Sequence, residues 1–197
     1  MRPVFAALLL AWLTLGAAGA DTARKSLAGH FLVARESMRD PRFAQSVIVI
    51  VRDDEAGTLG LVVNRLVGRA SFAEIHRELG LPGDPPDGDI DLYVGGPVQP
   101  EVGLIIHSSE FSTEDTIAVP GGIGLSRLGS VLAARASGDR PRAAIFTFGY
   151  AGWEPGQLDA ELARDAWDTV LTDLDIVFDT PPGELWDRVR LLRGLDL

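Results

Sequence analysis

The run from Phe148 to Leu158, FGYAGWEPGQL, constrains the fold of this chain more than any other segment. The apolar stretch Ala143–Phe148 leads into it and predicts a strand. Its glycine-spaced aromatic residues predict a turn, and the sequence from Gln157 predicts a helix to Trp167. Such a strand–turn–helix junction can present backbone N–H groups at a helix N-terminus, where anions and carbonyl oxygens bind well.

The other segments mix strands and helices without strict alternation. Two β-branched runs, at 46–51 and 58–64, flank a turn-like Asp53–Gly57 and predict a hairpin. A capping box at Ser71–Glu74 predicts a helix through Leu79. This mixture predicts a single domain of the α+β class rather than a doubly wound sheet. We also expect strands at 31–34, 90–94, 103–107 and 176–178, and helices at 126–136, capped by Ser126, and at 184–192.

The first twenty residues have the pattern of a secretory signal peptide. Arg2 supplies a short positive segment, residues 4–15 are almost wholly apolar, and Ala18–Ala20 is an A-x-A cleavage site. About 12–15 apolar residues are too few for a membrane span, which needs ~20. We therefore expect cleavage after Ala20, a mature domain at 21–197 without a membrane span, and a periplasmic or secreted location. An uncleaved anchor, or a start codon misplaced upstream of a cytoplasmic protein, are the alternatives.

The composition excludes several classes of function. The chain has no cysteine, which rules out thiolate metal sites, thiol nucleophiles and disulfides. It carries 28 acidic and 18 basic residues, a net charge of −10, and no run of Lys or Arg. Since an acidic chain repels the phosphate backbone, we expect no direct nucleic-acid binding.

His107, which ends an apolar strand pattern, is the one catalytic candidate. Its side chain can reach a pocket rim from there, or it can be a structural, hydrogen-bonded residue. The histidines lack zinc-ligand spacing, and the Asp87–Asp91 series lacks the glycine and glutamate of a calcium loop. The chain has no phosphate-loop pattern, and Ala151 stands where a hydrolase turn would carry its nucleophile. We therefore expect neither a metal nor a cofactor.

Four aromatic residues gather in the last third of the chain: Tyr150, Trp153, Trp167 and Trp186. They can line a pocket or a partner surface, or they can fill the core of the C-terminal half. Asn64–Arg65, polar residues at the end of a buried strand, can likewise form a structural hydrogen-bonding pair or line a pocket. The sequence leaves both questions open.

Six sequence blocks, in order, resemble those of the bacterial YqgE/AlgH family. The resemblance runs from about Leu27 to Trp186, nearly all of the expected mature chain. Any one block can occur by chance, but six in register are specific. The blocks are GHFLVA at 29–34, DPRFxxSV at 40–47, LGLVVNR at 59–65, GGPV at 95–98, GYAGWxxGQL at 149–158 and DIVFDTPxxxxW at 175–186.

The resemblance implies a strongly bent, branched β-sheet that contains a small barrel and is flanked by helices. It implies that Asn64, Arg65, the Gly95–Pro97 turn and the Gly149–Leu158 segment matter to the family, but it brings no reaction with it. Family members are often labelled transcriptional regulators, although they have no recognised DNA-binding motif. This chain departs from the family in its leader and at loop positions such as Leu66, where proline is usual. The ligand-binding candidates are Asn64, Arg65, Gly95, Gly96, Pro97, Gly149, Tyr150, Gly152, Trp153 and Gln157.

Three hypotheses follow for the function. The first is an exported, non-catalytic module that binds a small ligand or a protein through the Gly149–Gln157 segment and Asn64–Arg65. The second is a cytoplasmic protein that regulates transcription indirectly, which requires that the leader is not a signal peptide. The third is an enzyme that uses His107 together with a carboxylate or Arg65.

Overall fold

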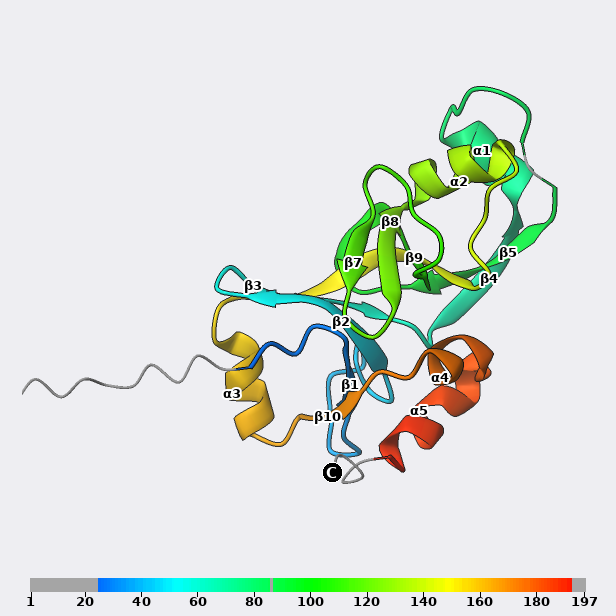
Figure 1. Ribbon diagram of the computed structural model, residues 1–197. Coiled ribbons are helices and arrows are strands. Elements are labelled where there is room, and N and C mark those ends of the chain that lie inside the picture. Colours follow the sequence, from blue (N-terminus) through cyan, green and yellow to red (C-terminus); the bar gives the residue numbers. More distant parts are fainter. Residues whose placement is uncertain (1–24, 86, 193–197) are drawn as a thin grey trace, which may run out of the picture.

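The structure, a computed structural model, describes residues 25–85 and 87–192, which form ten strands and five helices (Figure 1). This mixture confirms the α+β class. The strands are β1 (His30–Ala34), β2 (Val47–Asp54), β3 (Gly57–Val62), β4 (Leu66–Ser71), β5 (Asp89–Val94), β6 (Val98–Ser108), β7 (Ile117–Val119), β8 (Ile123–Arg127), β9 (Ala144–Trp153) and β10 (Trp167–Leu171). The helices are α1 (Phe72–Glu78), α2 (Leu128–Ala136), α3 (Gln157–Ala163), α4 (Leu174–Asp179) and α5 (Pro182–Arg190).

The sheet branches at β9. The first half of β9 pairs with β6 in antiparallel and with β5 in parallel orientation, and its last residues, Ala151–Trp153, pair with β3. The main path runs β10-β1-β2-β3-β9-β6-β8-β7, and β4 pairs with β5 as a side arm. The sheet is strongly curled, in the form of a half-barrel (Figure 1). The bent, branched sheet expected from the family resemblance is therefore confirmed.

The central strands are buried on both faces, which explains their continuous apolar sequences. In β1, Phe31 and Val33 belong to an apolar cluster covered by α4 and α5, whereas Leu32 and Ala34 belong to one covered by α3. The residues of β2 alternate between the same two clusters. A third cluster, which includes Ile105 of β6, lies under α1 and α2. Three groups of helices thus surround one sheet (Figure 1).

Elements with strong local signals form as predicted. The two β-branched runs are the β2–β3 hairpin, with Asp54 opposite Gly57. The capping box of α1 is complete, because the Ser71 hydroxyl accepts the Glu74 N–H at 3.1 Å and the Glu74 carboxylate accepts the Ser71 N–H at 3.0 Å. The strands expected at 31–34, 90–94 and 103–107 and the last helix are also present, with shifted ends.

Three predictions in the last third of the chain are wrong. The segment Gly149–Gly152 is not a turn, because β9 continues through it to Trp153 and pairs there with β3. The helix α3 ends at Ala163, and Trp167 starts strand β10, which pairs along its length with β1. Residues 176–178 are helical in α4, since three apolar residues do not define a period.

The expected cap of the second helix is also wrong. Ser126 lies in strand β8, and Arg127 occupies the N-cap position of α2 without a side-chain hydrogen bond. Strands β7 and β8 were not predicted, because Gly121, Gly122 and Gly124 interrupt the apolar pattern of that segment.

The predicted signal peptide at 1–20, its cleavage site and the start of the mature domain at Asp21 lie outside the described residues. Within 25–85 and 87–192, no helix is long and apolar enough to cross a lipid bilayer.

Candidate functional site

Four of the sequence-predicted site residues, Pro97, Gly152, Trp153 and Gln157, line one cleft beside α3. One wall is the loop Met38–Phe43, and the other is α3. The cleft measures about 380 Å³, which is within the size range of ligand pockets. We call it the α3 cleft, and its lining residues are Met38, Asp40, Arg42, Phe43, Pro97, Val98, Gly152, Trp153, Gln157, Glu161, Arg164, Ala166 and Trp167.

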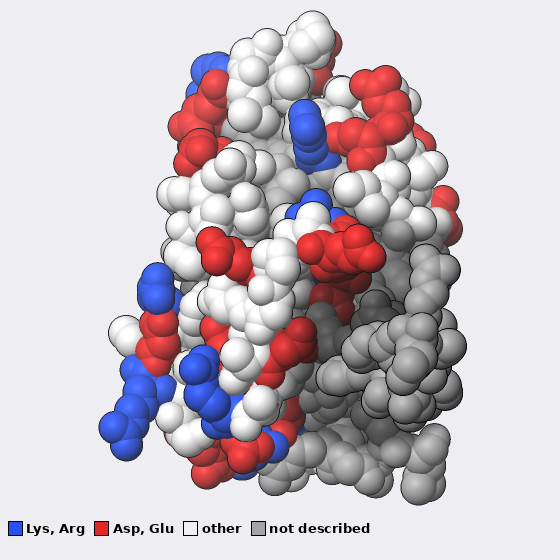
Figure 2. Space-filling view, turned by 90° about the vertical axis from the view of Figure 1, so that its left-hand side faces the viewer, with Lys and Arg blue, Asp and Glu red and all other residues white. Residues whose placement is uncertain are grey.

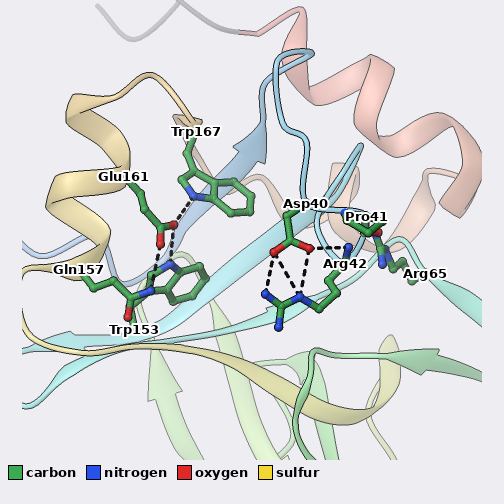
Figure 3. A network of polar contacts seen from close by, with 8 residues as sticks. All are labelled: Asp40, Pro41, Arg42, Arg65, Trp153, Gln157, Glu161 and Trp167. Carbon is green, nitrogen blue, oxygen red and sulfur yellow. Dashed lines mark hydrogen bonds and ion pairs between the residues drawn. The ribbon is translucent and has the colours of Figure 1, made fainter.

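Glu161 of α3 is the centre of a polar network in this cleft (Figure 3). Its Oε2 accepts the indole N–H groups of Trp153 at 3.0 Å and Trp167 at 2.8 Å. Its Oε1 accepts the Gln157 side-chain N–H at 3.0 Å. Three neutral donors therefore hold this carboxylate in one orientation and give both indoles the partner that a buried Trp N–H needs.

The two tryptophans also form an aromatic cluster with Phe43. The Phe43 ring stacks on Trp153 at 6.4 Å between centroids and meets Trp167 edge-on at 5.7 Å. Trp153 is only 6% and Trp167 2% exposed, so both are largely core residues. Trp186 lies apart from them and donates its indole N–H to the Ala34 carbonyl at 2.7 Å. Both interpretations of the aromatic residues, pocket lining and core, therefore apply to Trp153 and Trp167, because these core tryptophans form the floor of a cleft.

Asp40 and Arg42 form an ion pair on the opposite wall (Figure 3). Arg42 Nη2 lies 2.7 Å from Asp40 Oδ2, and the Arg42 Nε and backbone N–H donate to Oδ1 of the same carboxylate. These hydrogen bonds from Arg42 lower the pKa of the Asp40 carboxyl, and Asp40 in turn raises the pKa of the Arg42 guanidinium. The Arg42 guanidinium is exposed at the cleft rim, 5.8 Å from the centroid of the Phe43 ring.

Asn64 and Arg65 do not line the α3 cleft. They form hydrogen bonds with the segment that carries this wall. The Asn64 side chain accepts the Val47 N–H and donates to the Gln45 carbonyl, both at 2.9 Å. Arg65 donates to the carbonyls of Pro41 and Ala44, both at 3.1 Å. Both residues therefore fix the loop that carries Asp40, Arg42 and Phe43, and they line a separate, smaller hollow next to Trp186.

The candidate glycines Gly95, Gly96 and Gly149 allow the backbone of β9 to cross that of the Gly95–Pro97 segment. A Cβ on Gly95 would overlap the Gly149 carbonyl oxygen, and one on Gly96 would overlap the Tyr150 carbonyl group. Gly149 has φ +71°, and its own Cβ would lie 2.5 Å from the Gly96 carbonyl oxygen. Gly95, Gly96 and Gly149 are thus required for packing, whereas Pro97 and Gly152 reach the cleft. Tyr150 is partly buried against the cluster under α4 and α5.

Comparison with known proteins places this arrangement in a family. The family model DUF179, described as AlgH-like, matches residues 31–197. This chain belongs to the AlgH-like family. The UPF0301 protein AlgH of Pseudomonas aeruginosa is 41% identical over 170 residues, covering 85% of this chain and 89% of that protein. A UPF0301 protein of Rhodospirillum rubrum is also 41% identical over 170 residues, covering 86% and 88%.

Solved structures of other proteins agree with this assignment. The solution structure of AlgH from Pseudomonas aeruginosa has a TM-score of 0.70 at 38% identity and covers 89% of this chain and 92% of its own. Protein DIP2367 from Corynebacterium diphtheriae has a TM-score of 0.64 at 22% identity, with 85% and 87% covered, and shares the fold. The family membership predicted from the six sequence blocks is confirmed.

In this AlgH-like protein, His107 does not lie at a pocket rim; of the two alternatives that the sequence leaves open, the structure shows the hydrogen-bonded structural residue. The His107 side chain is 0% exposed. Its Nδ1 lies 3.1 Å from the Ser108 carbonyl oxygen, which can only accept, so Nδ1 carries the proton. In the neutral ring, Nε2 then accepts a hydrogen bond from the Ser126 hydroxyl at 2.9 Å. The ring packs against Gly124, where a Cβ would overlap it.

Sequence reasoning missed Asp40, Arg42, Phe43 and Glu161 as members of the site. The first three lie in the DPRF block, which served only to identify the family. Glu161 follows Gln157 by four residues, a spacing that places both side chains on one face of a helix and was available from the sequence. Within the described residues, no group of three or more His, Cys, Asp or Glu side chains is arranged to hold a metal ion.

Proposed function

We propose that this AlgH-like protein is a non-catalytic binding module and that the α3 cleft is its recognition site for a small ligand or a partner protein. The observation that carries the proposal is that segments far apart in the chain converge there. The loop 38–43, the end of the Gly95–Pro97 turn, the end of β9 and helix α3 together form one cleft of about 380 Å³.

The polar groups of the cleft support binding rather than chemistry. The carboxylates of Glu161 and Asp40 are both engaged by protein N–H donors, which leaves neither poised as a base. A reaction at His107 would need a substrate to reach a ring without exposed surface, so we do not propose the enzyme alternative.

A segment of a partner protein suits this cleft better than an enclosed small molecule. Its floor residues Trp153 and Trp167 are nearly fully buried, whereas the rim residues Arg42, Gln157 and Arg164 are exposed. An occupant would therefore lie across the rim. Arg42 is already paired with Asp40, whereas the exposed Arg164 at the rim favours a segment that carries an acidic residue beside an apolar one.

Photocrosslinking in living cells tests this proposal. We expect p-benzoylphenylalanine in place of Pro97, an exposed residue of the cleft lining, to give a discrete protein adduct, and the same group in place of Asp139, an exposed residue beyond α2, to give none. Arg42→Ala and Gln157→Ala should each reduce the adduct at least about fivefold while changing the free energy of unfolding by less than about 1 kcal/mol, because both are surface positions. Equal adducts at both positions, or an adduct that the substitutions leave unchanged, would contradict the proposed site.

We further propose export, on the basis of the leader sequence, with a cytoplasmic, indirect regulator of transcription as the alternative. On the face that carries α3 and the β2–β3 hairpin, acidic and basic side chains are interspersed without a continuous basic patch among the described residues (Figure 2). In either location, this face therefore favours a protein partner over nucleic acid. The intact mass of the native protein from separated cell fractions distinguishes them, since export predicts a periplasmic species that begins at Asp21.

A further inference from the structure

A second cleft, distant in the fold from the α3 cleft, separates two groups of helices. The helices α1 and α2 lie above, and α4 and α5 below, the arm formed by β4 and β5 (Figure 1). The cleft between α2 and α4 has a volume of about 370 Å³, and strands β5 and β9 form its floor. We call it the α2–α4 cleft. Among the residues that line it are Phe72, Tyr93, Arg135, Phe146, Phe178 and Thr180.

Arg135 is the unusual residue of this cleft. Its guanidinium carbon lies 4.1 Å from the centroid of the Phe72 ring, and its Nε is buried without a hydrogen-bond partner in the structure. No Asp or Glu among the described residues forms an ion pair with it, although a guanidinium has five N–H donors. Burial, with repulsion by Arg140, lowers the pKa of Arg135. A partly buried cation without a counter-charge is costly, and an anion in the cleft would remove that cost.

The other groups of the cleft restrict the charge and shape of such an anion. Two carboxylates, Asp89 and Asp91, line the same cleft; Asp91 is paired with Arg69 at 2.8 Å, and Arg69 also attracts Asp89. Since these carboxylates repel a dianion such as phosphate more than a monoanion, a single negative charge fits best. The Thr180 hydroxyl accepts a hydrogen bond from Arg188 at 3.1 Å and keeps its own proton to donate.

The rest of the lining is apolar and aromatic. Phe72 is buried, and the rings of Tyr93, Phe146 and Phe178 are partly buried around the cleft. A carboxylate group alone would leave this surface unfilled, whereas an apolar body attached to it would bury aromatic surface against aromatic surface.

We propose that the α2–α4 cleft binds a small monocarboxylic acid with an aromatic or branched apolar body, whose carboxylate accepts hydrogen bonds from the Arg135 guanidinium. The apolar body lies against the partly buried rings of Tyr93, Phe146 and Phe178, so the ligand connects α2 with α4. This site is independent of the α3 cleft, and its test does not depend on the function proposed above.

An NMR titration of the purified protein with 3-phenylpropionate tests the proposal. We expect saturable shifts of the backbone signals of Phe72, Arg135 and Phe178, with a Kd below about 10 mM. The neutral isostere 3-phenylpropionamide should bind about tenfold more weakly or not at all, because it cannot form the charge-assisted hydrogen bonds. Inorganic phosphate should not saturate these shifts.

Three variants separate binding from a purely structural role of Arg135, in which Arg135 only packs on Phe72 and faces the C-terminal end of α2. Arg135→Gln should weaken 3-phenylpropionate about tenfold or more, while Arg127→Gln, at an exposed arginine at the other end of α2 that does not line the cleft, should leave the Kd unchanged. Arg135→Lys keeps the charge but not the planar fork and should bind with intermediate affinity, which serves as the test if Arg135→Gln does not fold. Equal binding of acid and amide, unchanged binding by Arg135→Gln, or no saturable shift in the wild-type protein would each overturn the proposal.

Discussion

At the scale of single residues, Glu110 makes the clearest prediction about acid stability. Its Oε1 accepts the backbone N–H of Arg142 and the Ser108 hydroxyl, both at 2.7 Å. The hydrogen bond from the Arg142 N–H, followed by that from Ser108, lowers the pKa of Glu110 from 4.5 to about 2. Because the folded-state pKa is below the unfolded value, the stabilisation is present above about pH 4.5 and is lost as the pH falls toward 2.

The substitution Glu110→Gln removes this pH dependence. We expect the wild type to be more stable than the variant at pH 7, and the difference to shrink between pH 5 and pH 2, as measured by urea unfolding. Glu114→Gln, at a carboxylate for which the structure shows no such hydrogen bonds, is the matched control and should leave the pH profile unchanged. A difference between wild type and Glu110→Gln that is the same at pH 7 and pH 2.5 would contradict the assignment.

At the scale of elements, the crossing of β9 with the Gly95–Pro97 segment depends on Gly149. A side chain there would combine φ +71° with a contact to the Gly96 carbonyl oxygen. We expect Gly149→Ala to lower the free energy of unfolding by more than about 2 kcal/mol or to prevent folding. Gly68→Ala in β4 is the control, because a Cβ added there would have no atom within 4 Å and the φ of Gly68 is not positive, so the substitution should be neutral or slightly stabilising. Similar chemical denaturation midpoints for the two variants would show that the crossing tolerates a side chain.

The elements that sequence reasoning predicted well are those whose causes are local. The Ser71–Glu74 capping box and the β2–β3 hairpin are specified by residues a few positions apart. Gly152 and Trp167 were assigned wrongly because their conformations come from distant strands: Gly152 pairs with Leu59, and Trp167 with Ala34. Glycines and a single tryptophan carry no local signal for such pairing, so β9 was predicted too short and α3 too long.

At the scale of the whole molecule, the α3 cleft shows which residues of a site the sequence can identify and which it cannot. The family resemblance selected Pro97, Gly152, Trp153 and Gln157, which do line the cleft. It could not separate them from Gly95, Gly96 and Gly149. A position that serves packing and a position that serves binding both tolerate only a few residue types, so the two look alike in a sequence. The opposite wall, with Asp40 and Arg42, comes from a segment more than a hundred residues away, which only the folded sheet brings to α3.

The shared strands make a prediction about cooperativity. Because successive residues of β1 and β2 belong to the cluster with Trp186 or to the one with Trp153 and Trp167, neither cluster can open without exposing the other. In a Trp12→Phe background, Trp186→Phe leaves fluorescence from one cluster, and Trp153→Phe with Trp167→Phe leaves it from the other. We expect fluorescence and far-UV circular dichroism to give coincident urea transitions within each variant, although Trp186→Phe should lose about 1–3 kcal/mol with its bond to Ala34. A fluorescence transition that precedes the loss of circular dichroism in one variant would mean that its cluster unfolds separately, and that the two faces of the sheet are stabilised independently.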